Sequence, residues 1–252
     1  MDLNVIILSI VYFISGLLIG SFLNILIYKI PRKLPIFKPY AICYYCMQQV
    51  SVINNFPILS YLIRRSKCGK CNLKIPVQNI VVEVLTALIY LLVFLTFRTS
   101  VNTAIGIILT SILVVVSFID WKFMIIPNVI VLPFTIVVLG LSIIKNLAKW
   151  WLPLAFSAGA CVFMLIIHLI YPKGMGMGDV KLSLMLGAFL VKNVIVGLFI
   201  GFLIGSITGL SLIIAKKKNL KQFIPFDPFI SIGGLIAFFV GDYILRWYVG
   251  FI

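Results

Sequence analysis

The chain has 252 residues, of which 63% are hydrophobic and only 11% are charged. Apolar runs of about twenty residues recur along it, a pattern that indicates a polytopic membrane protein and argues against a soluble domain. The formal net charge is +15. It does not indicate a nucleic-acid partner, because the basic residues lie in short loops between apolar runs and not on one soluble face.

We predict an all-α fold of about eight transmembrane helices embedded in a lipid membrane. The predicted spans cover residues 4–28, 77–97, 101–119, 125–144, 152–171, 180–191, 193–215 and 226–247. The first begins near Asp2 and lacks the basic start of a signal peptide, so we interpret it as a retained span. The sixth is short for a full crossing. Either Lys192 reaches outward, or the sixth and seventh spans meet in a tight turn around Lys192 and Asn193.

The distribution of basic residues predicts the orientation of these spans. With the N-terminus outside, the loop of residues 29–76 and the other inside loops hold most of the lysines and arginines. The outer side then has only Arg98, Lys145, Lys149, Lys192 and Arg246. The positive-inside rule therefore places the 29–76 loop in the cytoplasm. We divide the chain into residues 1–97, with two spans and this loop, and residues 98–252, a six-span core.

Two aspartates stand at the ends of predicted spans, Asp120 in VVVSFIDWKFMIIPN and Asp179 in YPKGMGMGDVKL. Two complete crossings separate them, so both carboxyl groups reach the cytoplasmic boundary. Close carboxyl groups in a poorly hydrated site tend to share one proton. The ionised member can then draw a proton from water while the protonated member hydrogen-bonds a scissile carbonyl, as in aspartic proteases. Alternatively, each is an ordinary boundary charge near Lys122 or Lys181.

Glycines alternate immediately before the second aspartate, at Gly174, Gly176 and Gly178. A turn rich in glycine can adopt unusual backbone geometry and bring a substrate main chain close. A phosphate-binding loop is not indicated, because no strand precedes the glycines and no Gly-Lys-Ser/Thr follows them. We expect the three glycines and Lys181 to support a site built around Asp179.

His168 and Glu83 are further ionisable residues within predicted spans. His168 is the only histidine, and without a second histidine or an adjacent carboxylate we expect it to be neutral and hydrogen-bonded. Glu83 lies near the cytoplasmic start of the second span, where it either faces the site or pairs with a loop cation.

The glycines of the seventh span recur at four-residue spacing, which predicts close helix packing. They are Gly197, Gly201, Gly205 and Gly209.

Four cysteines of the 29–76 loop form two Cys-x-x-Cys knuckles, Cys43 with Cys46 and Cys68 with Cys71. This spacing predicts one tetrahedral Zn²⁺ site, which is structural because four protein ligands leave no open position. Disulfides or redox activity are the alternatives, but the cytoplasm is reducing. Cys161, in the fifth span, is interpreted as a buried small hydrophobe.

Together these features resemble the type IV prepilin leader peptidase family. Besides the knuckles, the resembling segments are GSFLNILIYKIP (20–31), IPVQNIVVEVLTALIY (75–90), FIDWKFMIIPN (118–128), GMGMGDVKL (174–182) and IPFDPFISIGG (224–234). The resemblance implies that Asp120 and Asp179 are the catalytic pair of a bacterial plasma-membrane peptidase. Its substrates are then prepilins or pseudopilins, whose basic leader is removed at the cytoplasmic face, after a glycine and before an apolar helix.

Members of this family with a long first loop often also methylate the new N-terminus with S-adenosylmethionine. The resemblance therefore implies a second activity that involves GSFLNILIYKIP, the loop and Glu83, with no cofactor contact assigned. Asn128 stands where the family commonly has aspartate and Asp227 where it commonly has glycine, and we expect neither to touch the pair. The alternatives are a peptidase without methyltransferase activity and a small proton- or cation-coupled transporter.

Overall fold

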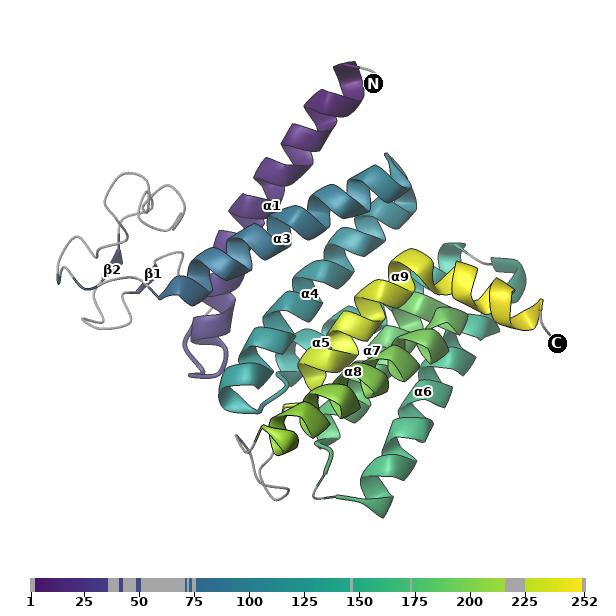
Figure 1. The fold of residues 1–252 in the computed structure, drawn as a ribbon. Helices are drawn as coiled ribbons and strands as arrows, with labels where there is room; N and C mark the ends of the chain where they lie inside the picture. The colour runs from purple at the N-terminus through teal and green to yellow at the C-terminus, as the bar shows by residue number, and fades with distance from the viewer. Residues whose placement is uncertain are drawn as a thin grey trace. The chain divides into compact units, whose positions relative to one another are not determined.

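The structure is a computed structural model that describes residues 3–35, 41–42, 49–50, 71, 73, 76–145, 147–172, 174–215 and 225–250. The described part is helical except for one antiparallel pair of two-residue strands, β1 (Ala41–Ile42) and β2 (Gln49–Val50). Its α-helices fall where the eight spans were predicted (Figure 1). They are α1 (Leu3–Lys29), α3 (Val77–Phe97), α4 (Val101–Phe123), α5 (Asn128–Lys145), α6 (Trp151–Ile170), α7 (Met177–Leu190), α8 (Val194–Ile214) and α9 (Asp227–Val249).

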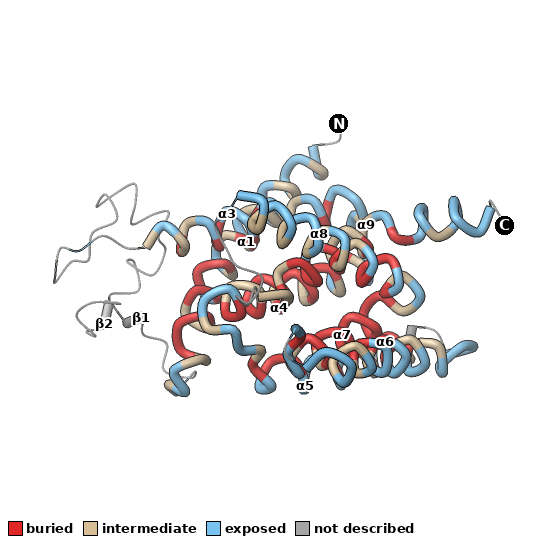
Figure 2. The backbone as a smooth tube through the Cα atoms, turned by 60° about the horizontal axis from the view of Figure 1, so that its bottom comes forward, coloured by how far each residue is buried: buried red, intermediate tan, exposed pale blue. Residues whose placement is uncertain are grey.

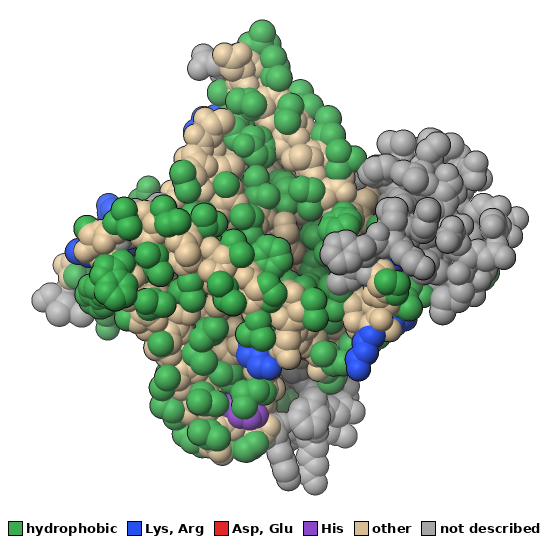
Figure 3. Space-filling model, turned by 180° about the vertical axis from the view of Figure 1, so that it is seen from behind, with side chains coloured by type: hydrophobic (Ala, Val, Ile, Leu, Met, Phe, Trp, Pro, Cys, Tyr) green, Lys and Arg blue, Asp and Glu red, His purple; other side chains and the backbone are tan. Residues whose placement is uncertain are grey.

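Six segments of the described chain are long and apolar enough to cross a membrane. One of them, Met177–Ile214, joins α7 and α8, and the apolar part of α5 is shorter. Hydrophobic side chains cover most of the coloured surface in Figure 3, as expected for a lipid-facing protein. The prediction of a polytopic membrane protein is therefore confirmed, but the prediction of eight complete crossings is not. With 14 residues, α7 is about 21 Å long, less than the roughly 30 Å of a hydrocarbon core.

The short helix α7 is enclosed by protein. It contacts α5, α6, α8 and α9, and nearly every residue from Asp179 to Leu190 is buried, as the red tube in Figure 2 shows. A helix that is apolar on all sides is stable when other helices surround it, and it then has no need to match the bilayer thickness. The 3₁₀ turn Val191–Asn193 leads from α7 into α8. Of the two alternatives considered for the short sixth span, the structure thus shows the tight turn around Lys192 and Asn193.

The chain divides into two compact units, Met1–Val115 and Val116–Ile252. In the first, α1 and α3 pack antiparallel at glycines, because a Cβ atom on Gly16 would lie 2.5 Å from the Cα of Ala87. Further along, the side-chain amide of Asn24 donates to the carbonyl of Asn79 at 2.9 Å. Small residues thus allow the two backbones to approach closely, as is usual between membrane helices.

In the second unit, glycines create two close helix pairs. A Cβ atom on Gly187 of α7 would lie 2.5 Å from the Cα of Ser157 in α6, and one on Gly233 of α9 would collide with the backbone of Gly197 in α8. Gly201 also contacts α9, so packing along this glycine face occurs as predicted. Helix α6 is therefore held against α7, and α8 against α9.

Candidate active site

The two predicted catalytic aspartates lie in the second unit and come from different helices. Asp120 is in the last turn of α4, which continues to Phe123, and Asp179 is in the first turn of α7. Their exposed fractions are only 7% and 5%. The carboxyl groups are close enough to interact electrostatically. The structure thus brings together the pair that the topology predicted.

The glycine-rich turn orients Asp179. The N–H of Gly176 donates to Oδ2 of Asp179 at 3.1 Å, and Gly176 is the N-cap of α7 with an extended backbone. A carboxylate in the third helical position that accepts the N-cap N–H forms one half of a capping box. The helix dipole also favours a negative charge at this end. Asp179 is therefore held by local backbone geometry.

The segments that carry the two aspartates contact each other. Helix α4 ends at Phe123. The next residue, Met124, turns the chain with a φ of 53°, and its N–H donates to the carbonyl of Asp120 at 2.8 Å. Two residues later, Ile126 lies against Gly178, where an added Cβ would be 2.8 Å from the Cβ of Ile126. Gly178 is therefore needed so that the start of α7 can pack against Ile126 of the same chain.

A third carboxyl group lies beside the pair, contrary to our expectation for Asp227. This residue begins α9 and is 0% exposed. Its backbone N–H donates to the carboxyl of Asp120, and its side chain interacts electrostatically with Asp120 and Asp179. Both of its Oδ atoms lack a hydrogen-bond partner within the described part of the chain. The signal available in the sequence was an aspartate at the start of an apolar span, in IPFDPF.

His168 and Lys181 make polar contacts around the pair. Nδ1 of His168 lies 2.7 Å from the carbonyl oxygen of Met175, so this nitrogen carries the hydrogen, and the predicted hydrogen-bonded role is confirmed. His168 also lies within electrostatic range of Asp179. Nζ of Lys181 donates to Oδ1 of Asn128 at 2.9 Å. Lys181 thus connects α7 to the start of α5.

Glu83 lies in the first unit. It is 1% exposed and accepts a hydrogen bond from the hydroxyl of Ser21, a residue of the GSFLN segment. Asn24, Asn79 and Lys29 are also buried in this helix pair. Polar side chains of α1 and α3 are therefore gathered between two otherwise apolar helices.

The predicted zinc site cannot be described as a whole, since Cys43, Cys46 and Cys68 lie outside the described residues; Cys71 is half-buried. Cys161 is also half-buried, and not fully buried as expected. Over the described ranges, no three His, Cys, Asp or Glu side chains are arranged to hold a metal ion. The zinc site remains a prediction.

Comparison with known proteins identifies the family. A model described as the bacterial peptidase A24 N-terminal domain matches residues 14–97, and one described as the type IV leader peptidase family matches residues 107–214. A prepilin leader peptidase/N-methyltransferase of Bacillus subtilis (strain 168) is 31% identical over 240 residues, which is 95% of this chain and 97% of that protein. This chain belongs to the type IV leader peptidase family.

Two further relatives carry the same name. This chain is 31% identical to the Pseudomonas putida protein over 92% of each chain. It is 30% identical to the Neisseria gonorrhoeae protein, over 92% of this chain and 91% of that one. No solved structure matches it significantly. Asp120 and Asp179 lie within the matched peptidase region and Asp227 lies beyond it.

Proposed function

We propose that this type IV leader peptidase is a membrane-embedded aspartic endopeptidase that removes the leader of prepilins or pseudopilins at the cytoplasmic face of the bacterial plasma membrane. The observation that carries the proposal is the pairing of Asp120 and Asp179, two buried carboxyl groups from separate helices. The names of the relatives support the substrate class. The basic residues of the 29–76 loop support the cytoplasmic side.

The pair can hydrolyse a peptide bond without a covalent intermediate. The ionised carboxylate takes a proton from a water molecule, whose oxygen attacks the carbonyl carbon, while the protonated carboxyl donates a hydrogen bond to the carbonyl oxygen. The tetrahedral intermediate then collapses. The C–N bond breaks, a carboxyl group returns a proton to the leaving amine, and the new N-terminus and the released leader separate. Gly176 and Asp227 orient the two carboxyl groups by their N–H groups.

The test is cleavage of a purified prepilin by the purified enzyme in lipid. Asp120→Asn and Asp179→Asn should each lower cleavage by at least about a hundredfold, because each removes a proton-transferring group. Asp242→Asn is the control, since Asp242 is 56% exposed and forms a 3.0 Å ion pair with Lys192. Normal cleavage by both active-site variants would contradict the proposal.

We also infer that the enzyme methylates the new N-terminus. The relatives are named N-methyltransferases as well, and the N-terminal family model covers the α1 and α3 pair in which Ser21 and Glu83 interact. S-adenosylmethionine would supply the methyl group, and we assign no residue to it. With labelled cofactor, label in the mature pilin separates this activity from a peptidase without it. The comparisons give no support to a transporter.

For the 29–76 loop we retain the proposal of a structural zinc bound by Cys43, Cys46, Cys68 and Cys71, because four thiolates at this spacing suit tetrahedral Zn²⁺. Residues 1–97 would then form the methyltransferase part and 98–252 the peptidase core. Metal analysis of the purified protein tests the site. Cys68→Ser should reduce the zinc content, and an unchanged content would remove the assignment.

A further inference from the structure

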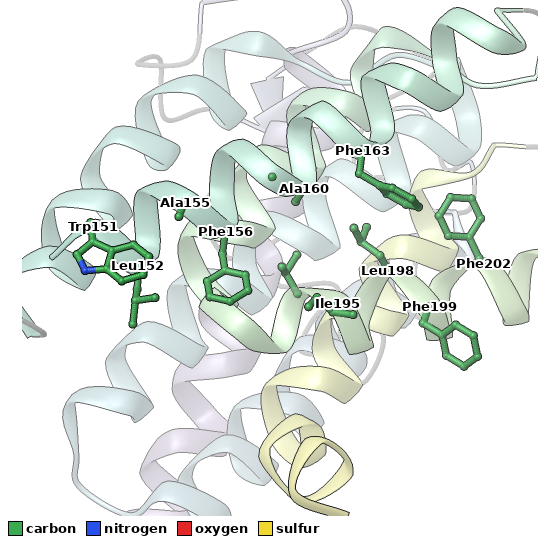
Figure 4. A pocket seen from close by; sticks show the side chains of 12 residues that line it. Trp151, Leu152, Ala155, Phe156, Ala160, Phe163, Ile195, Leu198, Phe199 and Phe202 are labelled. Carbon is green, nitrogen blue, oxygen red and sulfur yellow. The ribbon is translucent and has the colours of Figure 1, made fainter. Parts of the chain in front are cut away.

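An apolar groove lies between α6 and α8 in the second unit. Its volume is about 670 Å³, and its lining side chains are apolar except for the indole N–H of Trp151. In Figure 4, Trp151 of α6 lies at one end, and Phe163 of α6 and Phe202 of α8 lie near each other at the other. From Trp151 to Phe163 the groove follows about 18 Å of helix at 1.5 Å per residue.

The groove exists because its two walls are each bound to another helix. Gly187 holds α6 closely against α7, and Gly233 holds α8 closely against α9, so α6 and α8 make few contacts with each other. Gly159, on the α6 wall, deepens the space. A Cβ atom added there would meet no heavy atom within 4 Å.

Aromatic contacts connect the end of the groove at Phe163 and Phe202 to the candidate active site. The rings of Phe163 and Phe202 are 6.4 Å apart, and those of Phe202 and Phe226 are 5.0 Å apart. Phe226 immediately precedes Asp227, whose N–H contacts the Asp120 carboxyl. The other end lies at Trp151, the start of α6, whereas the end of α6 leads into the glycine-rich turn. The groove therefore extends away from the aspartates along the length of α6.

We propose that this groove binds the apolar transmembrane helix of the substrate. The inference rests on the proposed function, in which the scissile bond lies directly before such a helix. When that bond is at the aspartate pair, the helix has to continue from the site into the membrane, and the groove provides an apolar path in that direction. Membrane helices associate where small residues permit close approach, and Gly159 provides this on the α6 wall.

Recognition in the groove depends on shape and not on hydrogen bonds. Its lining offers no charged side chain, so substrate helices that differ in sequence but remain apolar fit equally well. Specificity for the cleavage position then comes from the aspartate site, and the groove sets the depth and direction of the helix. A lipid acyl chain is also apolar, and it is the competing occupant of the groove.

Filling the groove tests the proposal. In Gly159→Leu the new side chain occupies open space, and Leu favours a helix more than Gly does, so the fold is retained. Cleavage of a full prepilin in lipid vesicles should fall about tenfold, the cost of forcing overlap in a packed site. A soluble peptide with the leader and only the first residues after the cleavage point should be cleaved at the wild-type rate.

The matched control is Gly140→Leu on α5, because a Cβ atom at Gly140 also meets nothing within 4 Å and Gly140 does not line the groove. Equal cleavage of the full prepilin by the two variants would overturn the proposal, and so would an equal loss on both substrates by Gly159→Leu. If Asp120→Asn is inactive in the same assay, the proposed function stands although the groove assignment falls.

A photo-crosslinking phenylalanine analogue at Phe199 identifies the occupant directly. Phe199 lines the groove and is 63% exposed. In an Asp120→Asn background that retains substrate, we expect a cross-link to the apolar helix of the prepilin, and none from the same analogue at Phe134 on α5. Cross-links from Phe199 to lipid alone would show an acyl-chain groove and overturn the proposal.

Discussion

The backbone N–H of Asp227 donates a hydrogen bond to the carboxyl of Asp120. The N–H of Gly176 does the same for Asp179. Both donors lie at helix starts, Gly176 at the N-cap of α7 and Asp227 as the first residue of α9. N–H groups there have no acceptor within their own helix and carry the positive end of the helix dipole. A main-chain N–H group thus orients each of the two proposed catalytic carboxyl groups, whatever side chain the donor residue has.

Replacing Asp227 by Ala should leave cleavage within a few-fold of wild type, because the N–H to Asp120 remains. Thermal denaturation should show a gain of about 1 kcal/mol, since burying an unpartnered polar group costs about 1–3 kcal/mol and the favourable helix-dipole term of an N-terminal acid is smaller. Asp242→Ala, in the same helix but exposed, is the control. Activity as low as that of Asp120→Asn would show that the Asp227 carboxyl itself takes part in the chemistry.

Replacing Gly178 by Ala should lower kcat by about tenfold, because overpacking costs about 1–3 kcal/mol and the shift would displace the adjacent Asp179. The new methyl group would lie 2.8 Å from the Cβ of Ile126, an atom close to the backbone that cannot rotate away. Gly176→Ala is the matched control in the same turn. Its added Cβ would have no contact closer than 3.6 Å, and its N–H would still reach Asp179. Equal activity of the two variants would contradict this account.

The sequence predicted the helices to within a few residues at their ends, because charged or glycine-rich turns bound the apolar runs. It also predicted the pairing of Asp120 and Asp179, since an even number of crossings returns the chain to the same side. It did not predict that Asp227 joins them. That contact depends on how α9 packs against α8 at Gly233 and Gly197, and helical periodicity does not specify which helices become neighbours.

The incomplete crossing of α7 shows a second limit. Its composition is that of a membrane span, and only its length signalled a difference. The helices that surround it, seen in Figure 2, satisfy its apolar surface in place of lipid. Hydropathy measures how strongly a segment prefers to leave water. It does not distinguish a helix that is buried among other helices from one that faces lipid, because both environments are apolar.

The contact between Lys181 and Asn128 allows a test of whether a carboxylate at position 128 affects stability or cleavage. Asn128→Asp should convert the 2.9 Å hydrogen bond into an ion pair, raising stability by at most about 1 kcal/mol because the contact is exposed. The gain should shrink at high salt, where exposed charges are screened. Cleavage should be unchanged. A large rise in kcat would instead mean that this carboxylate supports the catalytic pair.

Removing the hydrogen bond of His168 should loosen the glycine-rich turn. His168→Leu leaves the carbonyl of Met175 without its donor, and we expect kcat to fall about fivefold, the equivalent of one hydrogen bond of about 1 kcal/mol. His168→Asn is the matched variant, because its amide nitrogen occupies nearly the position of Nδ1 and can donate to the same carbonyl. If His168→Asn restores activity at every pH tested, His168 has a positioning role. Equal loss in both variants would favour a role for the imidazole itself.

Glu83 provides a test that separates the two activities. A buried carboxylate in a membrane helix is costly, so its presence points to a function. Glu83→Gln can still hydrogen-bond Ser21, so the α1 and α3 pair should stay intact and leader cleavage should be unchanged, while methyl labelling of the mature product is lost. Thr86→Val is the control one turn away. Within the described residues, the Thr86 hydroxyl bonds the carbonyl of Val82 in its own helix and no other group, so this variant should retain both activities. Full labelling by Glu83→Gln would show that the negative charge is not needed for methyl transfer.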